Sequence, residues 1–98
     1  MLTQEQKNIE YRTIVDQLAE LYEKKNTLYG DSFNRQMHKY GLVAGCIPLD
    51  NKLSRIISIV QGAEDNGESL EDSLIDLASY SIIFLIHLKE KKQMEDKE

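Results

Sequence analysis

The stretch SLEDSLIDLASYSIIFLIHL, residues 69–88, decides the fold of this 98-residue chain. Its apolar side chains recur at intervals of three and four, which is the repeat of one face of an α-helix. That face carries Leu70, Leu74, Leu77, Ser81, Phe84 and Leu88, and Ala78, Ile82 and Leu85 widen it. Ser69 followed by Asp72 resembles a capping box and predicts the start of the helix. Because the helix is apolar on several sides, we expect it at the centre of a bundle or at a subunit interface.

The same periodicity predicts three more helices. A first helix is expected over residues 3–25, followed by a loop over 26–31. A short helix follows, with Ser32 as its N-cap and Gly41 as its stop. A third helix is predicted to reach about residue 61, with the stripe Leu42, Cys46, Leu49, Leu53, Ile56 and Val60. Pro48 lies inside this stripe and predicts either a kink or a helix that begins there.

Fold class and domain organisation follow from these segments. We expect an all-α bundle of three long helices and one short helix, with a turn over 62–68. Residues 1–92 are predicted to form one domain, and the charged residues 93–98 a flexible tail. A core of this size is only marginally stabilising, so we expect a homo-oligomer.

Charge and cysteine content narrow the possible partners. The net charge of −5 argues against a nucleic-acid polymer, whose phosphates require a basic face, but allows a small phosphorylated ligand. The single cysteine, Cys46, fits a reducing cytoplasm. The longest apolar run, residues 77–88, is too short and too polar to cross a bilayer. We therefore expect a soluble cytoplasmic protein without a membrane partner.

The segment KKNTLYGDSF, residues 24–33, concentrates groups that suit a nucleotide. Lys25 could contact a phosphate, Asn26 a sugar or base, and Tyr29 or Phe33 could stack on a base. The alternative is structural: Asn26 and Gly30 would shape a turn, while the two aromatic rings fill the end of the bundle. The composition does not decide between the two.

Acidic residues gather at the start of the last helix: Glu68, Glu71, Asp72 and Asp76. Carboxylates one turn apart suit Mg²⁺, but acids in a first turn also stabilise the helix dipole without any metal. Asp76 lies between apolar neighbours, so we expect it to be functional or paired with Lys52 or Arg55. Lys52 and Arg55 share a helix face and could hold phosphate or form salt bridges to the acidic helix.

The two histidines and the remaining motifs add little. We expect His38 to be exposed and His87 to be a half-buried residue with its hydrogen bonds satisfied. No cysteine and histidine spacing typical of zinc occurs, and neither a glycine-rich phosphate loop nor a nucleophile–base pair is evident.

Three segments together resemble a known family: KKNTLYGDSF, KYGLVAGCIPLDNKLSRI and ESLEDSLIDLASYSII. It is the nucleotide-modification-associated domain family (first type), which is similar to the MazG-like all-α NTP pyrophosphatases. The resemblance implies an oligomeric helical bundle, in whose pyrophosphatase relatives acidic helices bind nucleotide phosphates through Mg²⁺. The positions that match are Lys25, Asn26, Tyr29, Gly30, Ser32, Phe33, Lys52, Arg55, Glu68, Asp72, Asp76 and Tyr80.

Three positions depart from the family pattern. Leu28 and Asn51 stand where the pattern has acids, and Pro48 stands where it has an arginine. Hydrolysis through a metal-activated water needs several negative oxygens, whereas binding needs fewer. The resemblance, together with these departures, therefore predicts a protein that binds a nucleotide without hydrolysing it.

From this we expect a phage sponge, that is, a protein that sequesters a host immune signal in the infected bacterial cell. The signal is expected to be an NAD-derived or a cyclic nucleotide. No cofactor is expected. The ligand-binding residues expected are Lys25, Asn26, Tyr29, Ser32, Phe33, Lys52, Arg55, Asp76 and Tyr80. Two alternatives stay open. One is a Mg²⁺-dependent pyrophosphatase with Glu68, Asp72 and Asp76 as metal ligands, and the other is a structural bundle without a ligand.

Overall fold

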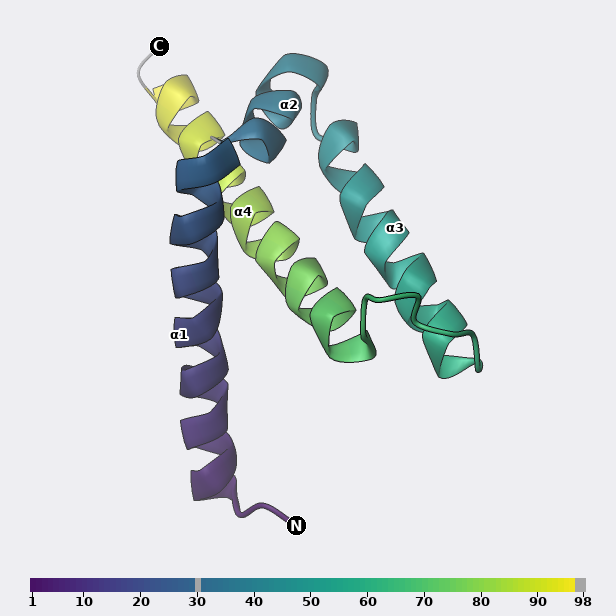
Figure 1. Ribbon diagram of the computed structural model, residues 1–98. Coiled ribbons are helices and arrows are strands. Elements are labelled where there is room, and N and C mark those ends of the chain that lie inside the picture. Colours follow the sequence, from purple (N-terminus) through teal and green to yellow (C-terminus); the bar gives the residue numbers. More distant parts are fainter. Residues whose placement is uncertain (30, 97–98) are drawn as a thin grey trace. The chain divides into compact units, whose positions relative to one another are not determined.

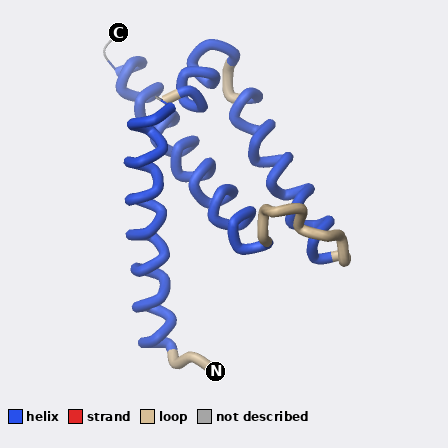
Figure 2. The backbone as a smooth tube through the Cα atoms, viewed as in Figure 1, coloured by secondary structure: helices blue, strands red, loops and turns tan. Residues whose placement is uncertain are grey.

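The computed structural model describes residues 1–29 and 31–96, apart from the side chains of residues 27–29. It contains four helices, α1 (Gln4–Tyr29), α2 (Ser32–Tyr40), α3 (Val43–Val60) and α4 (Leu70–Asp96). Figure 2 shows only helices and loops over the described part of the chain. The predicted all-α fold, with three long helices and one short helix, is confirmed. The chain forms two compact units, Met1–Gly30 and Asp31–Glu98.

The first unit is the helix α1. It begins after Thr3, whose Oγ1 accepts a hydrogen bond of 3.1 Å from the Gln6 amide, while Gln6 Oε1 accepts one of 2.9 Å from the Thr3 amide. This reciprocal pair is a capping box. The helix continues through Tyr29, so the loop predicted over 26–31 is wrong for residues 26–29. Nothing between Lys24 and Tyr29 breaks a helix, because polar side chains alone do not. The predicted positions Leu28, Tyr29 (side chains) and Gly30 lie outside the described residues.

The second unit is a three-helix arrangement. In it α3 and α4 run antiparallel, and α2 lies across the end where α3 begins (Figure 1). All three helices meet at the buried Gly45 of α3. A Cβ at Gly45 would lie 2.5 Å from Cε2 of Phe84 and 2.6 Å from Sδ of Met37, which is closer than ordinary van der Waals contact. Any larger residue at this position would therefore force Phe84 and Met37 to shift.

The helix ends of this unit match the predictions only in part. The N-cap of α2 is Asp31 rather than Ser32, which is already the first helical residue. Gly41 stops α2 as predicted, with a φ of 89° that favours glycine. At α4, Ser69 Oγ accepts a hydrogen bond of 3.0 Å from the Asp72 amide, which confirms the predicted cap.

Two boundaries within the long helices also differ from expectation. Pro48 lies inside α3, so the alternative of a helix beginning at Pro48 is wrong. Helix α4 continues through Asp96, so residues 93–96 of the predicted tail are helical, and residues 97–98 lie outside the described part. Within the described residues, no helix is long and apolar enough to span a membrane.

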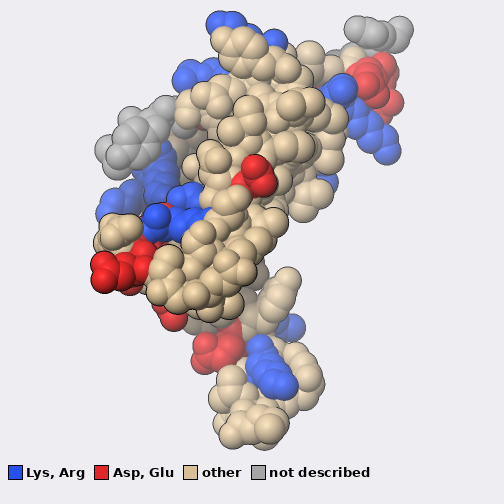
Figure 3. Space-filling model, turned by 90° about the vertical axis from the view of Figure 1, so that its right-hand side faces the viewer, with Lys and Arg blue, Asp and Glu red and all other residues tan. Residues whose placement is uncertain are grey.

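Large apolar side chains remain exposed on α3 and α4. In the stripe predicted for α3, Leu49 and Ile56 are half-buried, whereas Leu53 and Val60 are exposed. The side chains more than two-fifths exposed on these helices are Val43, Ile47, Leu53, Ile57, Val60, Leu74, Ile82, Leu85 and Met94. Figure 3 shows that the α3 side of this unit carries few charged groups. The three helices of the second unit thus leave much of their own apolar surface uncovered.

Candidate functional site

A charged cluster joins α3 to the beginning of α4. Lys52 Nζ lies 2.6 Å from Oε1 of Glu68 and 2.9 Å from Oδ2 of Asp76. Arg55 Nε lies 2.6 Å from Oε2 of Glu68. The pairing of Asp76 with Lys52 predicted from the sequence is confirmed. We call these four residues the charged cluster.

Arg55 also anchors the loop between α3 and α4. Its Nη2 donates hydrogen bonds to the backbone carbonyls of Asp65 and Glu68, the latter at 3.1 Å. The buried Nε, by contrast, has no hydrogen-bond partner among the described residues, because its ion pair with Glu68 lacks hydrogen-bond geometry. The Arg55 guanidinium therefore donates hydrogen bonds through Nη2, while its Nε–H is left without an acceptor.

The charges of this cluster balance, since it holds two cations and two carboxylates. The hydrogen bond to Glu68 raises the pKa of Lys52 above its ordinary value, with a further contribution from Asp76, while burial acts in the opposite direction. The four side chains keep between 21% and 30% of their surface exposed. Water and small ions therefore reach the cluster.

An aromatic pair includes Tyr80, which lies one turn beyond Asp76 of the charged cluster on α4. The rings of Phe33 on α2 and Tyr80 on α4 meet edge to face, with centroids 4.9 Å apart. Asp76 and Tyr80 are four residues apart on α4 and so lie on the same face of that helix. Phe33, Lys52, Arg55, Asp76 and Tyr80, predicted as ligand-binding residues, thus come together within the second unit.

The other predicted ligand-binding residues lie elsewhere or outside the description. Lys25 and Asn26 belong to α1 in the first unit. Ser32 is exposed at the start of α2, beside Phe33 in sequence. The Tyr29 side chain is not among the described groups. The structure of the second unit therefore assembles five of the nine predicted residues.

The three acids predicted as metal ligands are not gathered around one point. Glu68 and Asp76 both face Lys52. Asp72 is exposed in the first turn of α4, where its backbone amide is capped by Ser69. Among the described residues, no three histidine, cysteine or acidic side chains are placed to hold a metal ion.

A second polar cluster was not predicted from the sequence. Asn34 Oδ1 lies 2.8 Å from Nδ1 of His87, and Asn34 Nδ2 donates to Oε1 of Glu90 at 3.0 Å. The other carboxylate oxygen of Glu90 lies 2.8 Å from His38 Nε2. The rings of His38 and His87 are 4.3 Å apart. We call these four residues the amide–histidine cluster.

Burial and hydrogen bonding set the titration of this second cluster. Burial, reinforced by the neighbouring His38, lowers the pKa of His87. The hydrogen bond with His38 lowers the pKa of Glu90. The sequence held one signal for this cluster: Asn34 and His38 are spaced at four, and His87 and Glu90 at three, which places each pair on one helix face. As predicted, His38 is exposed and His87 is hydrogen-bonded, although His87 is buried more deeply than expected.

Comparison with protein-family models, with curated proteins and with solved structures finds no match to this chain.

Proposed function

We propose that this protein binds a small nucleotide and sequesters it without hydrolysing it. The observation that carries the proposal is that Asp76 of the charged cluster and Tyr80 of the aromatic pair share one face of α4. Asp76 and Tyr80 are four residues apart on α4, about 6 Å along the axis, so the cations of the charged cluster lie near the aromatic rings, as the phosphate of a nucleotide lies near its base. The resemblance to the nucleotide-modification-associated domain family supports the same conclusion.

The proposed binding mode uses an exchange of partners at Lys52 and Arg55. Phosphate oxygens replace Glu68 at the two cations, and one of them supplies the acceptor that Arg55 Nε lacks. The base stacks on Tyr80, and Asp76 accepts a hydrogen bond from a ribose hydroxyl. The partial exposure of the cluster makes this exchange feasible, since both carboxylate and phosphate can be hydrated there.

The remaining parts of this proposal rest on the resemblance. Lys25, Asn26, Tyr29 and Ser32 complete the ligand contacts, and the ligand is an NAD-derived or cyclic signal of a bacterial host. The protein then acts as a phage sponge in the host cytoplasm. We also propose a homo-oligomer, supported by the exposed apolar side chains of α3 and α4, which include Val43, Ile47 and Leu85.

A structural bundle is the second candidate, and a specific observation favours it. Lys52 and Asp76 are already paired within the chain, so the cluster serves to join α3 and α4 without any ligand. The third candidate, a Mg²⁺-dependent pyrophosphatase, uses the carboxylates Glu68, Asp72 and Asp76. The three candidates assign different roles to Glu68. In the nucleotide-binding protein its carboxylate competes with the phosphate, in the structural bundle it only joins α3 to α4, and in the pyrophosphatase it binds the metal ion.

The deciding experiment incubates the purified protein with a panel of nucleotides, including NAD-derived and cyclic ones, with and without Mg²⁺. The protein is then filtered and heated, and the released compounds are separated by chromatography. We expect an intact nucleotide that appears only after heating. A product that accumulates only with Mg²⁺ would instead identify the pyrophosphatase, and an empty release across the panel would favour the structural bundle.

Variants make the same experiment specific to the site. Arg55→Gln should weaken binding at least about tenfold, as expected when a charge-assisted bond to phosphate is lost. Arg35→Gln, on the exposed surface of α2, is the matched control and should leave binding unchanged. Glu68→Gln should strengthen binding, since it removes the competing carboxylate. A pyrophosphatase would instead lose turnover in Glu68→Gln, and equal affinities for Arg55→Gln and Arg35→Gln would rule out the proposed mode.

A further inference from the structure

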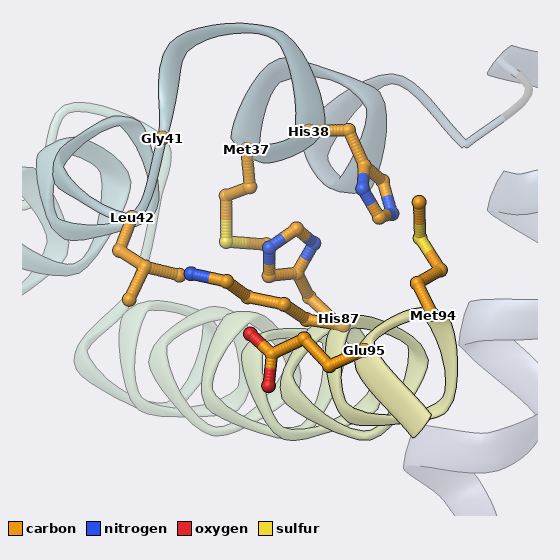
Figure 4. A pocket seen from close by; sticks show the side chains of 8 residues that line it. Met37, His38, Gly41, Leu42, His87, Met94 and Glu95 are labelled. Atoms are coloured by element: carbon orange, nitrogen blue, oxygen red, sulfur yellow. The ribbon is translucent and has the colours of Figure 1, made fainter. Parts of the chain in front are cut away.

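A pocket of about 320 Å³ lies beside the amide–histidine cluster, between α2, the start of α3 and the last part of α4. Its volume is at the lower end of the range for small-molecule sites. In Figure 4 the ring of His87 stands between Met37 and His38 on the inner side of this pocket. The lining residues are Met37, His38, Gly41, Leu42, His87, Lys91, Met94 and Glu95.

The inner end of the pocket presents a hydrogen-bond acceptor. The amide nitrogen of Asn34 donates to Glu90 and to Asp31, at 3.0 and 3.1 Å, so its oxygen must face His87. His87 then donates from Nδ1 to Asn34 Oδ1, and Nε2 carries the lone pair. Nε2 has no hydrogen-bond partner among the described residues, and only 3% of His87 is exposed. A nearly buried acceptor is thus left for a donor that occupies the pocket.

The outer part of the pocket presents one cation and one anion. His87, Lys91 and Glu95 follow each other at intervals of four and form a row along α4, about 6 Å apart along the axis. Neither Lys91 nor Glu95 has an ion-pair partner among the described residues. The charge of Lys91 is near enough to His87 to contribute to the lowered pKa of that imidazole. Along α4 the row therefore presents a hydrogen-bond acceptor at His87, a cation at Lys91 and an anion at Glu95.

We propose that this pocket binds a small α-amino acid whose side chain carries a hydroxyl group, of about the size of threonine. The hydroxyl group donates to His87 Nε2, the carboxylate pairs with Lys91, and the ammonium pairs with Glu95. The apolar atoms of the ligand lie against Met37, Leu42 and Met94. This site is separate from the charged cluster, so it does not depend on the nucleotide proposal.

Competing small ligands fit the row less well. A simple anion would meet Lys91 but also the uncompensated carboxylate of Glu95, which opposes it. An apolar amino acid such as valine would satisfy both charges but leave His87 Nε2 without a donor. Because a site built for a hydroxyl group discriminates strongly against an analogue that lacks it, threonine and valine should be separated clearly.

The test uses four probes that differ by one group each: L-threonine, L-valine, L-threonine methyl ester and 3-hydroxybutyrate. Binding is followed by NMR of the full-length chain with ¹³C-labelled methionine methyl groups. Met37 and Met94 line the pocket, whereas Met1 lies in the other unit and serves as an internal control. We expect threonine to shift the Met37 and Met94 signals and the ¹⁵N resonance of His87 Nε2, and each of the other probes to bind at least about tenfold more weakly.

Variants assign each charge to its partner. Lys91→Gln should abolish the difference between threonine and its methyl ester, and Glu95→Gln the difference between threonine and 3-hydroxybutyrate. Lys92→Gln and Asp96→Asn, exposed neighbours on α4, are the matched controls and should preserve both differences. None of the four side chains is buried, so the fold is retained.

Three results would overturn the proposal. The first is the absence of any shift at Met37 and Met94 with threonine at about 10 mM, where a site of 1 mM Kd would be roughly nine-tenths filled. The second is equal affinity for threonine and valine, since His87 would then select nothing. The third is an equal effect of Lys91→Gln and Lys92→Gln on threonine binding.

Discussion

The two polar clusters of the second unit hold their residues together in different ways. The charged cluster consists of four ionised groups, each with at least 21% of its side chain exposed. The amide–histidine cluster centres on Asn34 and His87, each only 3% exposed, with Glu90 and His38 at its rim. The charged cluster is stabilised by opposite charges within reach of water, whereas the centre of the amide–histidine cluster is stabilised by a buried hydrogen bond between two uncharged groups.

This difference bears on which cluster can accept a ligand by exchanging partners. Lys52 and Arg55 can release Glu68 to water at small cost, because exposed ion pairs contribute little free energy. Asn34 and His87 cannot part without leaving a buried polar atom unsatisfied. The charged cluster therefore suits exchange with phosphate, whereas the amide–histidine cluster fixes the geometry of the pocket next to it.

The largest effect should come from replacing the buried amide. Asn34→Leu keeps the size of the side chain but removes the acceptor of His87 Nδ1 and the donor to Glu90. Leaving a buried donor unsatisfied costs about 1–3 kcal/mol, so we expect the free energy of unfolding to fall by about 2 kcal/mol. Urea denaturation measures the change through its midpoint.

A double-mutant cycle sharpens this result. If the hydrogen bond between Asn34 and His87 is the cause, Asn34→Leu combined with His87→Leu should destabilise the protein by less than the sum of the single changes, because neither partner of that bond is then left unsatisfied. Arg35→Leu, next to Asn34 and exposed, is the control and should change stability by less than about 0.5 kcal/mol. Strictly additive losses would mean that the two side chains act independently.

The same contrast explains what the sequence could and could not predict. The helices followed from the spacing of apolar side chains, and a pairing of Asp76 with Lys52 or Arg55, as the alternative to a functional role, followed from the cost of an unpaired carboxylate among apolar neighbours. The amide–histidine cluster escaped prediction because its members are far apart in sequence and individually ordinary. Only the packing of α2 on α4 brings Asn34 to His87.

The prediction of where α1 ends was wrong for a different reason. The polar segment that ends at Gly30 predicts a loop from residue 26, but side-chain polarity does not stop a helix. A missing amide donor or a residue that favours positive φ does. For this reason α1 reaches Tyr29. Similarly, Ser32 and Asp31 are both good N-cap residues, and the sequence alone does not decide between neighbours that are equally suited.

The second prediction concerns the dependence of stability on pH, which should differ between the two clusters. The pKa of His87 lies below its ordinary value of 6.5, so the unfolded chain binds more protons there than the folded one. Stability should therefore fall as the pH drops below about 6.5. The pKa of Glu90 lies below 4.5, so its contribution is present above that pH and lost as the pH falls further. Lys52, whose pKa is raised, keeps its contribution up to its ordinary pKa of 10.5 and loses it only at higher pH.

Urea midpoints between about pH 7 and pH 5 measure the His87 contribution. The groups that face this imidazole are Asn34 and His38 from α2 and Glu90 and Lys91 from α4. Comparison of the protein with its His87→Gln variant removes the contributions of other groups, since these are common to both. We expect the decline over this range to be steeper in the parent protein. A steeper decline in the variant would mean that protonated His87 stabilises the fold.

The smallest loss of stability should come from a change in the charged cluster. Its dependence on salt concentration should distinguish it from the loss in Asn34→Leu. Glu68→Gln removes the charge that pairs with Lys52 and Arg55 but keeps the size of the side chain, so we expect a loss of about 0.5–1 kcal/mol at low ionic strength. This loss should shrink at about 1 M NaCl, where the screening length is near 3 Å, whereas the loss in Asn34→Leu should depend much less on salt, because the bond from His87 to Asn34 is buried and uncharged on both sides. Glu64→Gln, in the exposed loop, controls for the change in net charge. If both losses depended on salt to the same degree, the two clusters would be stabilised by the same electrostatics, and the reason to assign partner exchange to the charged cluster alone would be lost.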